Sequence, residues 1–163
     1  GRLEQRSGAG DVQTRLKVNL WGNDGGPTAL ALMPYVKLPL SASHVRNGHA
    51  EGGLIVPVAV ELAPGWSLGG QTQIDWVHYD PAGHGFEWGN TATLGRDITE
   101  RWAGFIEFAS RIAPESGLGW QGQIDLGFTW EARPGLQLDF GCYFGVTRSA
   151  PDYVPFLGLT WRY

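Results

Sequence analysis

The chain has 163 residues, 42% of them hydrophobic, with 25 glycines and 10 prolines, and this composition excludes a simple helical bundle or a disordered polymer. Its net charge is −4, and its lysines and arginines form no run that could follow a phosphate backbone, so no nucleic-acid partner is expected. The single cysteine, Cys142, excludes an internal disulfide framework, and no stretch approaches the roughly 18 apolar residues that a membrane-spanning helix needs.

Polar and apolar residues alternate from the first predicted strand onward. From Asp11 to Asn19 the odd positions are polar, and from Val12 to Leu20 the even positions are mostly aliphatic. A period of two is typical of a β-strand with one polar and one apolar face. The alternation recurs as far as Tyr163, so we predict an all-β chain whose sheet has one charged and one apolar face.

Clusters of Gly, Pro, Asp and Asn divide the chain into about nine strands of roughly ten residues, the length that a tilted strand needs to cross a bilayer. The predicted strands span residues 11–21, 28–39, 52–63, 66–79, 86–97, 101–112, 120–132, 136–147 and 154–163. Short links near 22–27, 63–65, 97–100 and 132–135 alternate with longer connections near 41–51, 80–85, 114–119 and 148–152. This alternation is typical of an antiparallel up-and-down transmembrane β-barrel.

Aromatic residues of the apolar face gather at both ends of the predicted strands. The expected membrane-interface girdle consists of Trp66, Trp76, Trp88, Trp102, Trp120, Trp130, Trp161 and Tyr163. Because successive strands reverse direction, these rings divide between the short-turn end and the long-loop end. Aromatic belts mark the two lipid–water interfaces of a membrane barrel, so we predict a barrel in the outer membrane of a Gram-negative bacterium.

The polar face mixes charged residues with small ones such as Gly127 and Gly141. A concave barrel interior is short of volume and a solvated outer surface is not, so we expect this face to be the lumen. The residues expected to line the lumen and set its selectivity are Arg15, Lys17, Tyr35, Lys37, Glu61, Asp75, Glu107, Arg111, Asp125, Asp139 and Tyr143. Arg96 is a charged exception on the apolar face. It lies at a short-turn end, where the free-energy cost of placing a charge against lipid falls toward zero.

Two interpretations of the lumen charges stay open. Opposite charges on neighbouring strands can pair to satisfy one another in a narrow interior. The two predicted groups are Arg15 and Lys17 near Lys37 and Glu61, and Glu107 and Arg111 near Asp125. Alternatively they line a wet path, with Tyr35, Tyr143 and Phe156 forming an apolar constriction.

The strand count predicts further chain upstream. If Tyr163 ends the last strand in the periplasm, nine crossings place residues 1–10 outside the cell, as the remnant of an extracellular loop. Bacterial single-chain barrels normally have an even number of strands and begin in the periplasm. We therefore expect residues 1–163 to form a single, N-terminally truncated β-barrel domain of a barrel of about twelve strands. A signal peptide and an odd number of further strands would precede Gly1.

The C-terminal strand alternates apolar residues and ends on an aromatic ring. Its outward positions are Pro155, Leu157, Leu159, Trp161 and Tyr163. This run looks like the terminal signal by which outer-membrane barrels are recognised by their assembly machinery. The alternative is an ordinary amphipathic edge strand.

Several segments resemble a known family. They are Gly53-Leu54-Ile55-Val56-Pro57 running to Glu61, Pro64-Gly65-Trp66-Ser67-Leu68-Gly69, Phe105-Ile106-Glu107-Phe108, Pro134-Gly135-Leu136-Gln137-Leu138-Asp139, Gly141 to Gly145, and Pro151-Asp152-Tyr153 to Tyr163. They resemble the outer-membrane family of putative MetA-pathway of phenol degradation proteins, often labelled transporter, over most of the chain. The resemblance implies an outer-membrane barrel that admits small hydrophobic or aromatic compounds. It implies no catalytic or binding residue.

Two short motifs match functional patterns but lack the expected structural setting. Gly65-Trp66-Ser67-Leu68-Gly69 matches G-x-S-x-G, yet a nucleophile elbow needs a helix after the turn, and here a second strand is predicted. Gly117-Leu118-Gly119-Trp120-Gln121-Gly122 matches G-x-G-x-x-G, whose phosphate site needs a helix N-terminus that the sequence does not predict. We therefore predict no enzyme activity, no catalytic residue and no cofactor.

The four histidines, His44, His49, His78 and His84, lie in or beside the longer connections. Imidazoles near Asp80 or Glu51 are candidate metal ligands, but their spacing fits no closed tetrahedral ligand set and loop histidines are usually solvated, so no metal site is predicted. Ser43 or Ser41 with His44 suggests a membrane hydrolase, but adjacent residues of a strand point to opposite faces, so Ser43 and His44 cannot hydrogen-bond directly.

Three functions follow from these patterns. The first is a passive outer-membrane channel or transporter for small molecules, with the lipid bilayer, the assembly machinery and a small-molecule permeant as partners. The second is a structural or surface-interaction barrel with a plugged lumen. The third inverts the faces and gives a soluble ligand-binding barrel with a dry core.

Overall fold

The structure, a computed structural model, describes residues 11–39, 48–117 and 119–162. Ten strands follow one another along the chain, with a single turn of 3-10 helix, η1 (Pro114–Ser116), between β7 and β8. The strands are β1 (Val12–Arg15), β2 (Val18–Trp21), β3 (Thr28–Leu38), β4 (Glu51–Ala63), β5 (Trp66–Tyr79), β6 (Gly83–Asp97), β7 (Trp102–Ile112), β8 (Gln121–Arg133), β9 (Leu136–Gly145) and β10 (Tyr153–Trp161). Among the described residues, no helix has the length and apolarity needed to cross a membrane.

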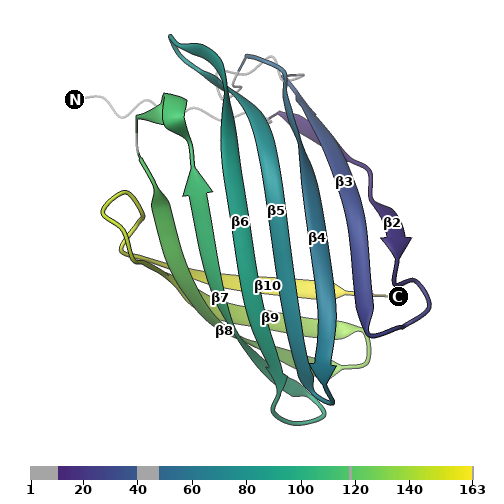
Figure 1. The fold of residues 1–163 in the computed structure, drawn as a ribbon. Helices are drawn as coiled ribbons and strands as arrows, with labels where there is room; N and C mark the ends of the chain where they lie inside the picture. Colours follow the sequence, from purple (N-terminus) through teal and green to yellow (C-terminus); the bar gives the residue numbers. More distant parts are fainter. Residues whose placement is uncertain (1–10, 40–47, 118, 163) are drawn as a thin grey trace, which may run out of the picture.

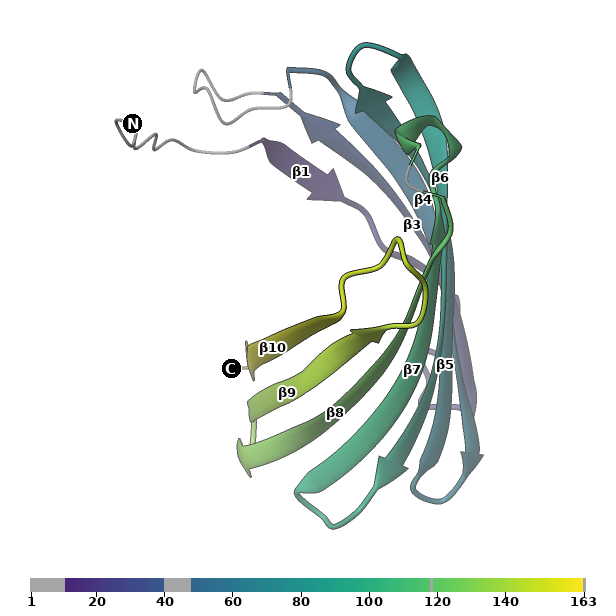
Figure 2. The ribbon, with the colours of Figure 1, turned by 90° about the vertical axis from the view of Figure 1, so that its left-hand side faces the viewer.

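All ten strands form one antiparallel sheet with up-and-down order. The order is β1-β3-β4-β5-β6-β7-β8-β9-β10, and β2 also pairs with β3. Figure 2 shows that the sheet is strongly curved, so that β9 and β10 bend round toward the side on which β1 lies. The described strands therefore form a partial barrel, which confirms the predicted all-β, up-and-down class.

The predicted strand at 11–21 is two strands, because its partner contains a proline. β1 pairs with β3 up to the Arg15–Tyr35 pair, and β2 resumes at the Val18–Leu32 pair. Between them the amide of Leu16 donates to the carbonyl of Pro34, but Pro34 has no N–H to return that bond. The ladder is interrupted there.

The connection predicted as long near 80–85 is a short turn instead. β5 and β6 stay paired as far as Tyr79 opposite Gly83, which leaves three residues, 80–82, between the strands. Gly83 has a φ of +84°, a left-handed conformation that glycine adopts without steric cost and that allows the tight reversal. The remaining predicted boundaries agree with the structure to within three residues.

The two faces of the sheet differ in burial as the alternation predicts. On β8, Asp125 is 2% exposed and its neighbour Leu126 is 47% exposed. The side chains on the concave face of a curved sheet converge, so the crowded, charged face is the concave one. Glycine is needed in this crowded layer, because a Cβ added at Gly127 would lie 2.4 Å from Cζ of Phe105.

Candidate functional site

The candidate site is the charged concave side of the sheet, which we call the polar face. It carries the predicted lumen residues Arg15, Lys17, Tyr35, Lys37, Glu61, Asp75, Glu107, Arg111, Asp125, Asp139 and Tyr143. The structure arranges these residues in separate clusters, each built by the register of two or three neighbouring strands.

The first cluster surrounds Asp75 on β5. The Tyr35 hydroxyl donates to Asp75 Oδ1 at 2.6 Å, although β4 lies between the two strands. Tyr35 can reach across because Gly53 stands opposite both residues, and a Cβ there would lie 2.5 Å from Asp75 Oδ1. The Gln73 side-chain amide donates to the other carboxylate oxygen at 2.6 Å. Both oxygens of this buried carboxylate are therefore hydrogen-bonded.

The second cluster holds Glu87 on β6. Its carboxylate is 4% exposed, forms an ion pair with the Arg111 guanidinium from β7 and accepts a hydrogen bond from the Tyr79 hydroxyl. Arg111 lies directly opposite Gly89, which leaves its side chain room to reach Glu87. The sequence pairing expected for Arg111, with Asp125, is not formed, because the register places Arg111 opposite Gln121.

The third cluster lies at the end of β3 and the start of β4. Lys37 Nζ is 2.7 Å from Glu51 Oε2 and 3.6 Å from Asp11 Oδ2. The backbone N–H of His78 donates to Glu51 Oε1 at 3.1 Å. Glu51 was not among the predicted lumen residues, because it stands at the edge of the long connection and was not assigned to a face.

An acidic tract runs across β7, β8 and β9. Glu107 lies directly opposite Asp125, and Asp125 lies directly opposite Tyr143. Thr93 donates to Glu107 at 2.5 Å and Gln137 donates to Asp139 at 2.6 Å, whereas Asp125 Oδ1 is buried without a hydrogen-bond partner. Within the described part of the chain, Glu107, Asp125 and Asp139 form no ion pair. This part of the polar face therefore carries three carboxyl groups with no cation beside them among the described residues.

Amide side chains also line the polar face, although the predicted lumen residues are only charged or aromatic ones. A hollow of about 230 Å³ is bordered by Gln71, Gln73, Arg111, Gln121 and Gln123. Gln71 and Gln73 are hydrogen-bonded to each other at 2.9 Å. These glutamines occupy odd positions of β5 and β8, which the alternation assigns to the polar face. The alternation alone is therefore enough to predict that they line it.

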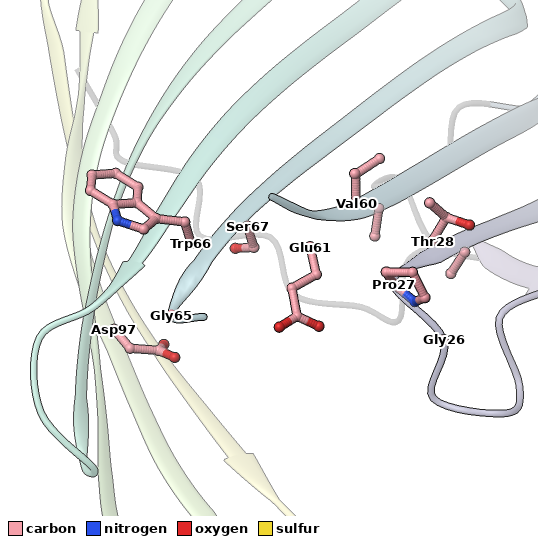
Figure 3. A pocket seen from close by; sticks show the side chains of 11 residues that line it. Gly26, Pro27, Thr28, Val60, Glu61, Gly65, Trp66, Ser67 and Asp97 are labelled. Carbon is pink, nitrogen blue, oxygen red and sulfur yellow. The ribbon is translucent and has the colours of Figure 1, made fainter. Parts of the chain in front are cut away.

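The remaining predicted residues lie toward other parts of the polar face. Lys17 borders a small hollow against β3 and β4, and the Arg15 guanidinium carbon lies 5.7 Å from the ring centre of Tyr35. Glu61 lies at the short-turn end, beside a hollow of about 350 Å³ that Ser67 and Asp97 also line (Figure 3). β5 begins at Trp66, so Ser67 stands in a strand and not in a strand–turn–helix elbow.

The predicted aromatic constriction is brought together only in part. The rings of Tyr143 and Phe156, on the adjacent strands β9 and β10, have centroids 5.2 Å apart. Tyr35 is on β3, near the other edge of the sheet, and packs with Asp75 instead.

The apolar face is convex and carries the predicted girdle residues at the ends of the strands. Trp66, Trp76, Trp88, Trp102, Trp120 and Trp161 are exposed, Trp130 is partly exposed, and Tyr163 lies outside the described residues. At the short-turn end Trp102 stacks on Trp130 with ring centroids 5.7 Å apart. Arg96, the charged exception, places its guanidinium carbon 4.7 Å from the Trp66 ring centre, so its charge is stabilised by a cation–π contact.

Trp21 is a further exposed aromatic residue at the short-turn end that the alternation does not reveal. It stands on an odd position, where the first strand carries polar residues. A register shift between Asn19 and Trp21 places Trp21 opposite Leu30, on the apolar face. A β-bulge adds one residue to a strand and so exchanges the faces beyond it.

The chain was compared with protein families and with curated proteins. The family model described as Putative MetA-pathway of phenol degradation matches residues 1–163. No curated protein matches the chain.

Proposed function

We propose that this chain, which belongs to the Putative MetA-pathway of phenol degradation family, forms the wall of an outer-membrane channel. Small molecules would cross this channel by passive diffusion. One observation carries this proposal: the large apolar side chains lie on the exposed convex face and the carboxylates on the crowded concave face. Soluble monomers rarely expose contiguous apolar patches of more than a few hundred Å². A sheet that is apolar outside and polar inside matches the environment of a bilayer and a wet lumen.

The permeant that fits the polar face best is a small neutral or cationic molecule with an aromatic ring. The carboxylates Glu107, Asp125 and Asp139 oppose the passage of anions. Tyr143 and Phe156 offer ring surfaces on which a flat apolar compound can stack. The family description names phenol degradation, and phenol is such a compound.

Reconstitution of the intact protein into lipid vesicles and planar bilayers tests the channel. We expect swelling with small neutral solutes and a single-channel conductance that favours cations over anions. In the double variant Glu107→Gln/Asp125→Asn the cation preference should fall, because two carboxyl groups of the polar face that have no cationic partner are removed. Inserted protein that gives no conductance and no swelling would contradict the proposal.

A barrel with a plugged lumen is a second candidate, favoured by the pairs Arg111–Glu87 and Lys37–Glu51, which satisfy charges within the wall itself. In that case, charge-neutralising changes at Glu107 and Arg111 should lower stability while permeability stays at the lipid baseline. A soluble barrel with a dry core is not favoured. The buried hydrophobic residues of the described segments are Ala31, Ile55, Ala113 and Ala150, which are too small a set for an apolar core.

We also propose that the outward face of β10 contacts the outer-membrane assembly machinery. Leu157, Leu159 and Trp161 are all well exposed and stand on alternate positions of this strand. β10 is at the edge of the sheet and pairs only with β9 in the described residues. An edge strand offers both free backbone groups and an apolar row to a partner.

A further inference from the structure

Three histidines from different parts of the chain meet at the end of the sheet opposite the hollow of Figure 3. His49 precedes β4, His78 is near the end of β5 and His84 is near the start of β6. The register places His78 directly opposite His84. On its other side β5 pairs with β4, and the last pair at this end is Gly52 opposite Trp76. Continued by three residues, the same register places His49 opposite Tyr79, the last residue of β5.

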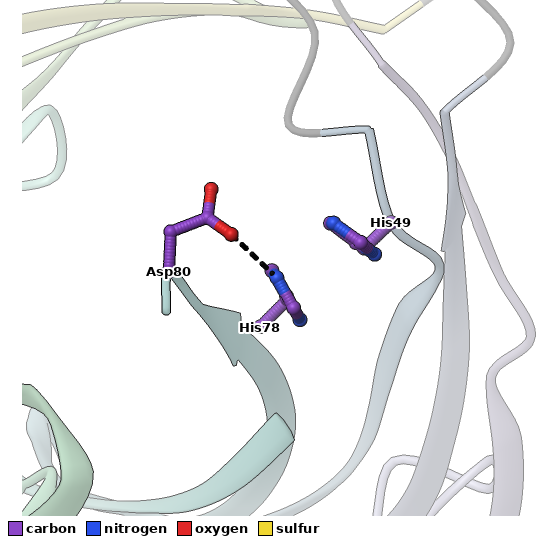
Figure 4. Close-up of side chains that lie close together, drawn as sticks. All are labelled: His49, His78 and Asp80. Atoms are coloured by element: carbon purple, nitrogen blue, oxygen red, sulfur yellow. Dashed lines mark hydrogen bonds and ion pairs between the residues drawn. The ribbon is translucent and has the colours of Figure 1, made fainter. Parts of the chain in front are cut away.

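His49, His78 and Asp80 lie close enough to share an ion (Figure 4). The imidazole rings of His49 and His78 are stacked with centroids 3.4 Å apart, and His78 Nε2 is 2.9 Å from Asp80 Oδ1. One possible ligand atom from each of the three residues lies within 4.8 Å of the others. In a tetrahedral zinc site with bonds of about 2.0–2.2 Å, ligand atoms are roughly 3.3–3.5 Å apart. The widest pair would therefore have to close by up to about 1.5 Å, and the His78 Nε2–Asp80 Oδ1 pair, now 2.9 Å apart, would have to open by about 0.5 Å.

A buried nitrogen at this cluster lacks a partner. The His78 side chain is 10% exposed, and its Nε2 is taken by Asp80. Its other ring nitrogen, Nδ1, is buried and has no hydrogen-bond partner. An unsatisfied buried nitrogen costs free energy, so the described protein groups do not complete the surroundings of this imidazole. Because Asp80 lies against Nε2, an ion shared with Asp80 would be bound through Nε2.

We propose that His49, His78 and Asp80 bind a divalent transition-metal ion of the zinc class. Imidazole and carboxylate are the ligands that Zn²⁺ and its neighbours in the first transition row accept from proteins. The ion joins His49, two residues before β4, to the end of β5, so it links two neighbouring strands beyond their last paired residues. This site is separate from the carboxylates of the acidic tract and does not depend on the channel function.

His84 lies beside the ion site without belonging to it. Its ring stacks on Trp76 with centroids 3.8 Å apart, and its Nε2 is 3.0 Å from the carbonyl oxygen of Ala50. His44 and Ser43 lie outside the described residues. His84→Phe is therefore a matched control, because phenylalanine keeps a ring over Trp76 and removes both ring nitrogens.

Zinc titration of the intact protein tests the proposal. The protein is purified in detergent with a tag that contains no histidine, stripped with chelator and titrated with Zn²⁺ by calorimetry. Co²⁺ absorption in the visible range provides a second readout. We expect about one ion per chain. His49→Gln and His78→Gln should each weaken binding by at least about tenfold, and Asp80→Asn by about tenfold, while His84→Phe stays within about twofold of the original affinity.

Thermal unfolding in chelator shows which variants are folded. His49→Gln changes a residue outside the strands, so it provides a folded variant if His78→Gln does not assemble. Wild-type protein that takes up no Zn²⁺ would overturn the proposal. So would binding that His49→Gln and His78→Gln leave unchanged, or binding that only His84→Phe abolishes.

Discussion

Arginine in place of Leu126 should lower the stability of the assembled protein by about 2–4 kcal/mol. Leu126 is exposed on the convex face of β8, midway between Trp120 and Trp130. If lipid covers this face, a charge there lies near the middle of the bilayer, where its desolvation cost is largest. The measurement is reversible urea unfolding of the intact protein in lipid vesicles, followed by tryptophan fluorescence.

The matched control is Ile98→Arg, in the short turn between β6 and β7. Ile98 is also exposed and borders an apolar hollow with Trp102, but it lies beyond the end of β6 and two residues from Arg96, where a native arginine is already accommodated. We expect a cost of about 0–1 kcal/mol there, because the cost of a charge falls toward the interface. Equal effects of the two substitutions, or no effect of either, would show that lipid does not cover this face.

Methionine in place of Arg111 should destabilise the protein by about 2 kcal/mol. The substitution leaves the buried Glu87 carboxylate with Tyr79 but without its cation. Loss of one partner from a fully buried pair typically costs about 3–5 kcal/mol, and we expect less here because the Arg111 side chain is 55% exposed. The same unfolding measurement gives the difference.

The double variant Arg111→Met/Glu87→Leu separates the lost ion pair from the buried charge that is left behind. We expect it to recover most of the stability, since no unpaired charge remains in the crowded face. If the double variant is no more stable than Arg111→Met alone, the Glu87 carboxylate is not the source of the cost.

The sequence predicted the strands and their faces because both depend on a local pattern. A period of two assigns each residue to a face without knowledge of its partner strand, and Leu126 and Asp125 stand as that pattern indicates. The predicted strand boundaries are wrong where the neighbouring strand determines the local structure. The break after Arg15 is caused by Pro34 on β3, and the short turn at 80–82 is stabilised by pairing of Tyr79 with Gly83.

The contacts within the candidate site could not be predicted, because they depend on strand register. Tyr35 reaches Asp75 only because Gly53 of the intervening strand stands opposite both. Likewise, His49 and His78 are 29 positions apart in sequence, and only the β4–β5 register brings their rings together. The spacing of the ligands along the sequence therefore cannot predict such a site.

The proposed channel requires that lipid contacts the apolar face of the sheet, and spin labels along β8 measure this contact directly. Cysteines placed one at a time at residues 121, 123, 124, 125, 126 and 128, in a Cys142→Ala background, would carry the label in vesicles. Gly127 is left unchanged, because a side chain there would meet the Phe105 ring. We predict that collisions with oxygen, which dissolves in lipid, peak at residues 124, 126 and 128, while a water-soluble nickel chelate does not reach those positions. Free access of the nickel chelate to residues 124, 126 and 128, or oxygen collisions that do not alternate between successive residues, would show that lipid does not cover the convex face.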